Sequence, residues 1–207
     1  MKLEDLYETP QSIGDIGEDH PLNNRAQNAK LAYKYLADKR KKLIKQLADG
    51  VNLWELPIEY VGIDQRTNPP RVIYYVRYEV QNLGYIGRKA ASQVLVWRSR
   101  AGQITSGLAS NIFFNYILPK TGTIVTDYLQ TKEGAGFWED RINDALSSNK
   151  FVYYVNFLPP RVIKQITNID ELRAMRNTVW GDHQKYRQRR LIITSHQLKV
   201  EGEKPGD

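Results

Sequence analysis

Apolar residues recur at helical spacing between residues 24 and 49, where they predict a single amphipathic helix. Asn24 is placed to cap its first turn and Gly50 to end it. The apolar positions are Leu31, Tyr35, Leu36, Leu43 and Leu47. The opposite face carries the cations Lys39, Arg40, Lys41, Lys42 and Lys45. This basic face is interpreted either as a row of phosphate contacts or as an ordinary solvated helix face.

Short runs rich in β-branched and aromatic residues follow that helix and predict strands. Residues 58–64 and 71–81 form a predicted hairpin around the proline loop at 66–70. Another strand is expected near 93–98. The remaining predicted strands lie at 123–128, 151–157, 161–166 and 191–194, the last of them at an edge of the sheet.

Helices are predicted between these later strands. One covers residues 108–117 and is ended by Pro119 and Gly122, and a second lies around 138–146. A short third helix opens with a capping box at Asn168. The order of elements predicts an α/β (α+β) fold with a mixed, mostly antiparallel central sheet and flanking helices.

Chain length and composition set the expected organisation. The 207 residues suffice for one domain with a core, predicted over 24–198 and including the N-terminal basic helix. Residues 1–23 are expected to form an extended arm and residues 199–207 a disordered tail. No apolar run approaches the ~18–20 residues of a membrane span, and the N-terminus does not resemble a secretory signal. We therefore expect a cytoplasmic protein that does not enter a membrane.

The charge favours acidic partners. The formal net charge is +7, which attracts nucleic acid, acidic proteins and phosphorylated small molecules. The chain has no cysteine, which excludes disulfides, thiol catalysis and cysteine zinc sites. Its three histidines, His20, His183 and His196, are not at ligand spacing, so no metal site is expected.

The segment 101–109 lies between a predicted strand and a predicted helix and is rich in small residues. A phosphate needs converging backbone N–H groups and a close approach of the backbone, which small residues allow. The residues predicted to hold a phosphate-bearing cofactor are Gln103, Ile104, Thr105, Ser106, Gly107 and Ala109. The alternative is an ordinary strand-to-helix turn capped by Ser106.

This loop and the elements after it resemble the GNAT superfamily of acyl-CoA N-acyltransferases over roughly residues 58–166. That family has a Gln/Arg-x-x-Gly-x-Gly/Ala loop, and this chain has Gln103 and Gly107-Leu108-Ala109 there, with one additional residue between them. The family's Asn-x-x-Ala-x-x-(Phe/Leu)-Tyr pattern corresponds to Thr131–Trp138. The resemblance implies acetyl-CoA or another acyl-CoA as cofactor, with its pyrophosphate in the loop. It also implies acyl transfer to an amine that the sequence does not specify.

Family enzymes usually deprotonate the amine with a carboxylate or a water that it holds, and many protonate the departing thiolate with a tyrosine. Trp138 stands in the place of that tyrosine and cannot donate a proton in the same way. The resemblance therefore leaves Glu79 or Asp127 as the candidate base and Tyr128 as the candidate acid. Each of the three also fits an ordinary structural role.

A second hypothesis is a catalytically inactive GNAT-like protein that binds through basic surfaces. Its partner would be nucleic acid or a host or virion protein, contacted by the cations of the predicted basic helix and by a second basic segment. That segment contains Lys185, Arg187, Arg189 and Arg190, with Tyr186 between them for base stacking. Its alternative is a solvated border beside an edge strand.

Two further segments, 130–134 and 185–193, together with the polar arm, resemble uncharacterised GNAT-like proteins of tailed phages. That resemblance implies a location in an infected bacterial cell or in a virion.

Overall fold

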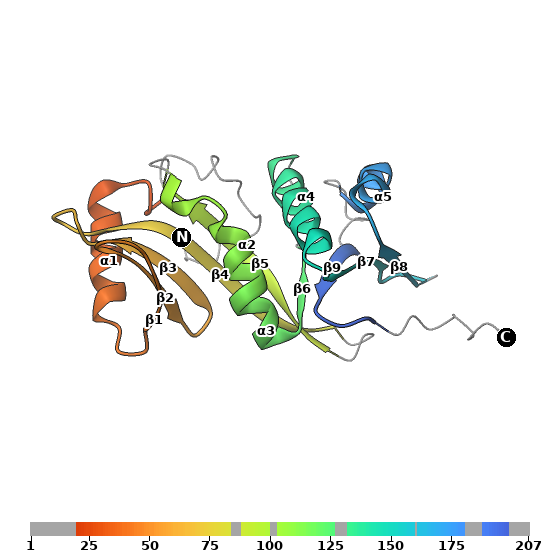
Figure 1. Cartoon of the computed structure of the whole chain (residues 1–207), viewed down its shortest axis with the longest axis horizontal. Coiled ribbons are helices and arrows are strands. Elements are labelled where there is room, and N and C mark those ends of the chain that lie inside the picture. The colour runs from red at the N-terminus through yellow and green to blue at the C-terminus, as the bar shows by residue number, and fades with distance from the viewer. Residues whose placement is uncertain are drawn as a thin grey trace. The chain divides into compact units, whose positions relative to one another are not determined.

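The computed structural model describes residues 20–83, 88–99, 103–126, 132–159, 161–180 and 188–198. Within them the fold is α+β, built around a large, mixed and mostly antiparallel sheet (Figure 1). The strands are β1 (Lys42–Ala48), β2 (Val51–Leu56), β3 (Glu59–Asp64), β4 (Arg71–Leu83), β5 (Arg88–Arg98), β6 (Thr123–Val125), β7 (Phe151–Asn156), β8 (Val162–Ile166) and β9 (Arg189–Thr194). Hydrogen-bonded neighbours follow the order β1-β2-β3-β4-β5-β6-β9-β7-β8. Of the pairings with a described register, only β5–β6 is parallel.

The described helices lie mostly in the second half of the chain. They are α1 (Arg25–Ala37), α2 (Leu108–Ile112), α3 (Leu118–Thr121), α4 (Lys132–Ser147), α5 (Ile169–Ala174) and α6 (Arg176–Val179). A 3-10 turn, η2 (Gln103–Thr105), precedes α2, and a π-helical turn, η3 (Phe113–Ile117), joins α2 to α3. The chain divides into two compact units, Met1–Glu79 with Gln93–Ile112 and Val80–Ser92 with Phe113–Asp207.

The core of the first unit forms between α1 and the antiparallel strands. Ala32 of α1 is fully buried and clusters with Val61, Ile63 and Val72 of β3 and β4. Leu22, before the helix, belongs to the same cluster and is 6% exposed. The predicted cap is confirmed, because Asn24 accepts hydrogen bonds from the backbone N–H groups of Ala26 and Gln27. The predicted hairpin at 58–64 and 71–81 is also confirmed, as β3 and β4.

The prediction of one helix over 24–49 is wrong in its second half. The helix ends at Ala37, and Asp38 then accepts hydrogen bonds from the backbone and guanidinium N–H groups of Arg40, which makes a turn. Residues 42–48 form strand β1, which pairs with β2 around the two-residue turn Asp49-Gly50. Gly50 has a φ of +64°, so it serves the hairpin turn instead of ending a helix.

The core of the second unit joins β6, β7 and β9 to the segment around β5. Val125, Tyr153 and Ile192 are fully buried in one cluster, together with Ala90 of β5. The predicted edge strand at 191–194 is an inner strand, since β9 pairs with β6 on one side and β7 on the other. Its apolar run Leu191-Ile192-Ile193 is buried, and since successive side chains of a strand point to opposite faces, both faces of β9 are covered.

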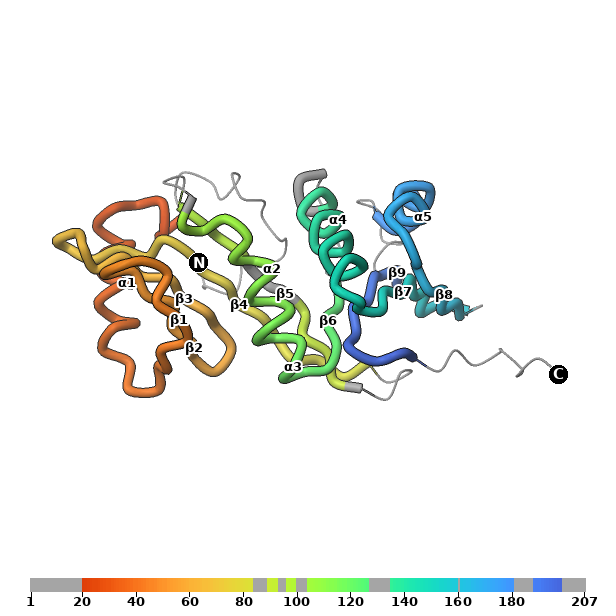
Figure 2. The backbone as a smooth tube through the Cα atoms, viewed as in Figure 1, coloured from red at the N-terminus to blue at the C-terminus, as the bar shows by residue number. Residues whose placement is uncertain are grey.

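One helical segment runs from Leu108 to Thr121 through α2, η3 and α3, and Figure 2 shows it as a continuous coil. Pro119 was expected to end this helix but lies at the start of α3, and the helical segment continues past it to Thr121. The segment ends at Gly122 instead, as expected, with a φ of +70° and its N–H bonded to the carbonyl of Leu118. The predicted N-cap of α5 is confirmed, since Asn168 accepts from the N–H of Glu171 at 2.9 Å, while the Glu171 carboxylate accepts from the N–H of Thr167 at 3.0 Å and not from that of the cap residue.

Candidate functional site

The predicted cofactor turn follows the end of β5 and leads directly into α2. Residues 103–105 form the 3-10 turn η2, and the first described helical bond after it runs from the Asn111 N–H to the Gly107 carbonyl at 3.1 Å. Ser106 and Gly107 are exposed, whereas Thr105 is 3% exposed and Ala109 is 7% exposed. Ile104 is half-buried. Among the residues from Ile104 to Ala109, the exposed ones are therefore the two at the tip, Ser106-Gly107.

Gly107 is the residue that allows this turn. Its φ of +68° lies in the left-handed region, which other L-residues rarely adopt. A Cβ placed on Gly107 would have no heavy atom within 4 Å, apart from its own neighbours in the chain. The backbone at the tip is consequently both specially shaped and open to an approaching ligand.

The helical segment behind the turn gives it an electrostatic character. The N–H groups of a first helical turn have no partner inside the helix, and the helix dipole places partial positive charge there. The segment is held by its apolar side, on which Ile112, Phe113 and Ile117 are at most 1% exposed. Its π-helical turn at Phe113–Ile117 is of a kind that occurs frequently at functional sites.

The same segment connects the one described parallel strand pair. Ala91 and Ser92 of β5 pair with Ile124 and Val125 of β6. Parallel neighbours need a crossover connection, and here the crossover contains the turn and the helical segment. In open α/β sheets, ligands bind at the carboxyl ends of strands, where such crossovers begin. The turn after β5 occupies that position in the chain.

The structure describes only one of the three predicted catalytic residues, Glu79. Glu79 lies exposed in β4, two residues beyond the Glu59–Arg77 pair at which the β3–β4 register ends. Asp127 and Tyr128 lie outside the described residues, as does the side chain of Gln103. Arg98, at the end of β5, is exposed. The described residues thus bring Glu79 and the turn into one unit of the chain but do not reveal a desolvated base.

Trp138, which stands where the GNAT pattern has a tyrosine, is a core residue. It is fully buried and packs edge-on against Phe113 and Phe137, each with a ring-centroid distance of 5.7 Å. Burial of this kind anchors α4 to Phe113 of η3 within the second unit.

The cations of the predicted basic helix face do not lie on a helix. Lys39 and Arg40 lie in the loop after α1, and Lys42 and Lys45 lie on strand β1. Arg40 pairs with Asp38 at 2.8 Å, and hydrogen bonds from Arg40 lower the pKa of that carboxyl to about 2. Lys41 lies over the ring of Trp54, 5.5 Å from its centroid.

The second predicted basic segment is only partly described. Lys185 and Arg187 lie outside the described residues. Arg190 is 5% exposed, stacks its guanidinium over Phe157 and donates to Gln81. Arg189 donates to the carbonyl of Thr178 at 3.1 Å. Arg190 therefore does not belong to an exposed basic surface.

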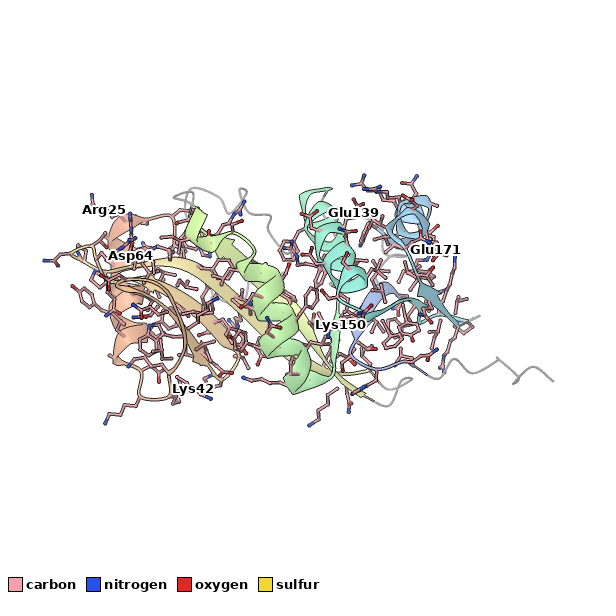
Figure 3. The ribbon with its side chains drawn as sticks, in the orientation of Figure 1. Arg25, Lys42, Asp64, Glu139, Lys150 and Glu171 are labelled. Atoms are coloured by element: carbon pink, nitrogen blue, oxygen red, sulfur yellow. The ribbon has the colours of Figure 1, made fainter. Side chains whose placement is uncertain are left out.

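Sequence reasoning missed three exposed cations and one exposed aromatic ring of α1. Arg25, Lys30 and Lys34 are exposed, and so is Tyr33, at 53%. Their i, i+3 and i+4 spacing would have placed Lys30, Tyr33 and Lys34 on one helix face. Figure 3 shows Arg25 near one end of α1 and Lys42 beyond the other end, where β1 begins.

Comparison with protein-family models, with curated proteins and with solved structures produced no significant match. None of the helices in the described part of the chain is long and apolar enough to cross a membrane. Over the same residues, no group of three or more histidine and carboxylate side chains is arranged to hold a metal ion.

Proposed function

We propose that the chain is an acyl-CoA-dependent N-acyltransferase-like protein of GNAT type, with the CoA pyrophosphate bound at the turn 103–109. The observation that carries the proposal is the tip Ser106-Gly107, where a left-handed, uncrowded backbone begins a helical segment. A pyrophosphate needs N–H donors and a backbone without obstructing side chains, and both are supported at this tip.

The connectivity around the turn supports the same assignment. β5, the turn, the helical segment and β6 form a strand–helix–strand crossover with parallel strands, and α4, β7 and β9 follow along the chain. A strand, loop, helix, strand, helix and strand in this order is the pattern on which the GNAT resemblance rests.

The proposed reaction transfers an acyl group from sulfur to nitrogen. The amine attacks the thioester carbonyl, the C–N bond forms, the C–S bond breaks and CoA leaves as a thiolate. One proton must leave the amine and one must reach the thiolate. Glu79, exposed on β4, and Asp127 remain the candidate bases, and Tyr128 remains the candidate acid. Trp138 is excluded from the acid role because its ring is fully buried in the core.

Calorimetric titration of the protein with acetyl-CoA and with free CoA tests the cofactor assignment. Saturable binding in the micromolar range is the expected result, and no heat at about millimolar ligand contradicts the proposal. Transfer itself is then measured as thiol release in the presence of a panel of primary amines. Because the chain has no cysteine, a thiol reagent reports the released CoA without any signal from the protein.

A further inference from the structure

The positive charge of the chain is concentrated in one segment of the first unit. Residues 25–48 contain eight lysines and arginines and one carboxylate, which gives a formal charge of 8 − 1 = +7. The whole chain also has a formal charge of +7, so its remaining residues sum to zero. The basic character is therefore a local property of α1, β1 and the loop between them.

Most of these cations are available to a ligand. Arg40 is occupied by Asp38, and Lys41 lies over Trp54. The other six are exposed, and none of them makes an ion pair with any residue that the structure describes. These six residues are called the basic surface below: Arg25, Lys30, Lys34, Lys39, Lys42 and Lys45.

Helix α1 holds its part of the basic surface in a fixed orientation. Its inner side is defined by Asn28, Ala29 and Ala32, which are buried. Lys30, Tyr33 and Lys34 project from other positions of the helix and are exposed. With 13 residues, α1 is about 20 Å long, which is enough to follow several phosphates of a polynucleotide.

Strand β1, which follows α1 along the chain, carries two further cations of the basic surface at the edge of the described sheet. It has β2 as its only described neighbour, and none of its residues is buried. Lysines on an edge strand also discourage unwanted pairing between sheets, and that role accounts for Lys42 and Lys45. It does not account for the cations on α1 or for an exposed tyrosine between two of them.

We propose that the basic surface binds single-stranded nucleic acid, with the cations on phosphates and one base stacked on Tyr33. Proteins that bind single strands combine a positive track for the backbone with aromatic rings that accept bases of any sequence. An acidic protein could pair with the cations, but it would leave the exposed ring of Tyr33 without a binding partner of its own. The inference does not depend on cofactor binding at 103–109.

The test is fluorescence anisotropy of a labelled oligothymidylate or oligouridylate of about 20 nucleotides, titrated with the full chain over a series of salt concentrations. Replacing Arg25, Lys30 and Lys34 by glutamine should weaken binding and lower the slope of log affinity against log salt. The expected decrease in slope is about 2, because each phosphate contact contributes about 0.7. The control replaces Lys89, Lys150 and Lys164 of the second unit by glutamine, which removes the same charge and should leave the slope unchanged.

Substitutions of Tyr33 distinguish the binding of nucleic acid from the binding of other polyanions. Tyr33→Ala should weaken oligonucleotide binding roughly 5- to 100-fold, whereas Tyr33→Phe should retain it. Circular dichroism of each variant verifies that α1 still folds. The proposal would be overturned by no binding at about 50 mM salt, by equal losses in the two triple variants, or by unchanged binding by Tyr33→Ala. Competition by polyglutamate as effective as by the oligonucleotide would also overturn it and would indicate an acidic protein as the partner.

Discussion

The side chain of Asn28 in α1 bonds both backbone groups of Val72 in β4. Its Nδ2 donates to the Val72 carbonyl at 3.0 Å, and its Oδ1 accepts from the Val72 N–H at 2.7 Å. The same Nδ2 donates to the Leu22 carbonyl at 2.8 Å. Asn28 is 6% exposed, so its side chain satisfies the buried N–H and carbonyl of Val72 and fixes the orientation of α1 against β4.

Replacing Asn28 by alanine should lower the free energy of unfolding by about 2–4 kcal/mol. The substitution leaves the N–H and carbonyl of Val72 buried without their partner, and an unsatisfied buried group costs about 1–3 kcal/mol. Urea denaturation measures the change, and Gln27→Ala, one position earlier on an exposed side of α1, is the matched control. Equal stabilities of the two variants would show that the Asn28 bonds contribute nothing.

The carboxyl of Asp64 should make stability depend on pH. It is 3% exposed and accepts from the Arg66 guanidinium at 2.8 and 2.9 Å. The hydrogen bond from Arg66 lowers the pKa of Asp64 below its usual value. A carboxyl whose pKa is lower in the folded state stabilises the fold above its unfolded pKa of about 4. That contribution is lost as the pH falls through the folded pKa.

Asp64→Asn should therefore be less stable than the parent chain by about 1.5–3 kcal/mol at neutral pH, with a gap that narrows below about pH 4. Denaturation at a series of pH values measures that gap. Asp170→Asn removes an exposed carboxyl that pairs with Arg173 and should change stability little at any pH. A gap that stays constant down to the most acid pH would contradict the role given to Asp64.

Trp138 should matter for stability and not for proton transfer. Trp138→Ala removes a fully buried ring and should cost about 3–5 kcal/mol, while Phe137→Ala, at a half-buried ring beside it, should cost less. Trp138→Tyr restores the side chain of the GNAT pattern but places its hydroxyl in the core, so it should not accelerate acyl transfer. Thiol release by the purified variants measures the second effect, and a faster Trp138→Tyr variant would contradict the assignment of this residue to the core.

The N-terminal segment shows which features of the fold follow from local sequence. Asn24 caps α1 as its side-chain chemistry predicts, because a cap is a local interaction. The spacing of Leu43 and Leu47 predicts a continuing helix, but pairing with β2 makes this segment a strand. A local signal for the strand was nevertheless present in Asp49-Gly50, the dipeptide that two-residue hairpins prefer.

In the candidate sites, too, local features could be predicted from the sequence and long-range contacts could not. The turn at Gly107 could be predicted, since small residues between a strand and a helix are a local pattern. The burial of Arg190 could not, because it depends on Phe157 and Gln81, which lie far from it in the chain. The exposed cations Arg25, Lys30 and Lys34 lie within the confirmed part of the predicted helix, but the sequence interpretation assigned the basic face to the cations after Ala37 alone.

Calorimetric titration of acetyl-CoA into two variants of Gly107 tests the central claim most directly. Asparagine and aspartate have the same shape and both tolerate a φ of +68°, so Gly107→Asn and Gly107→Asp differ mainly in charge. A pyrophosphate at this turn predicts that Gly107→Asp loses acetyl-CoA binding by far more than Gly107→Asn does. Gly122, with a φ of +70° and open surroundings, supplies the matched pair at the other end of the helical segment, and its two variants should bind equally. Equal binding by Gly107→Asn and Gly107→Asp would contradict the cofactor site.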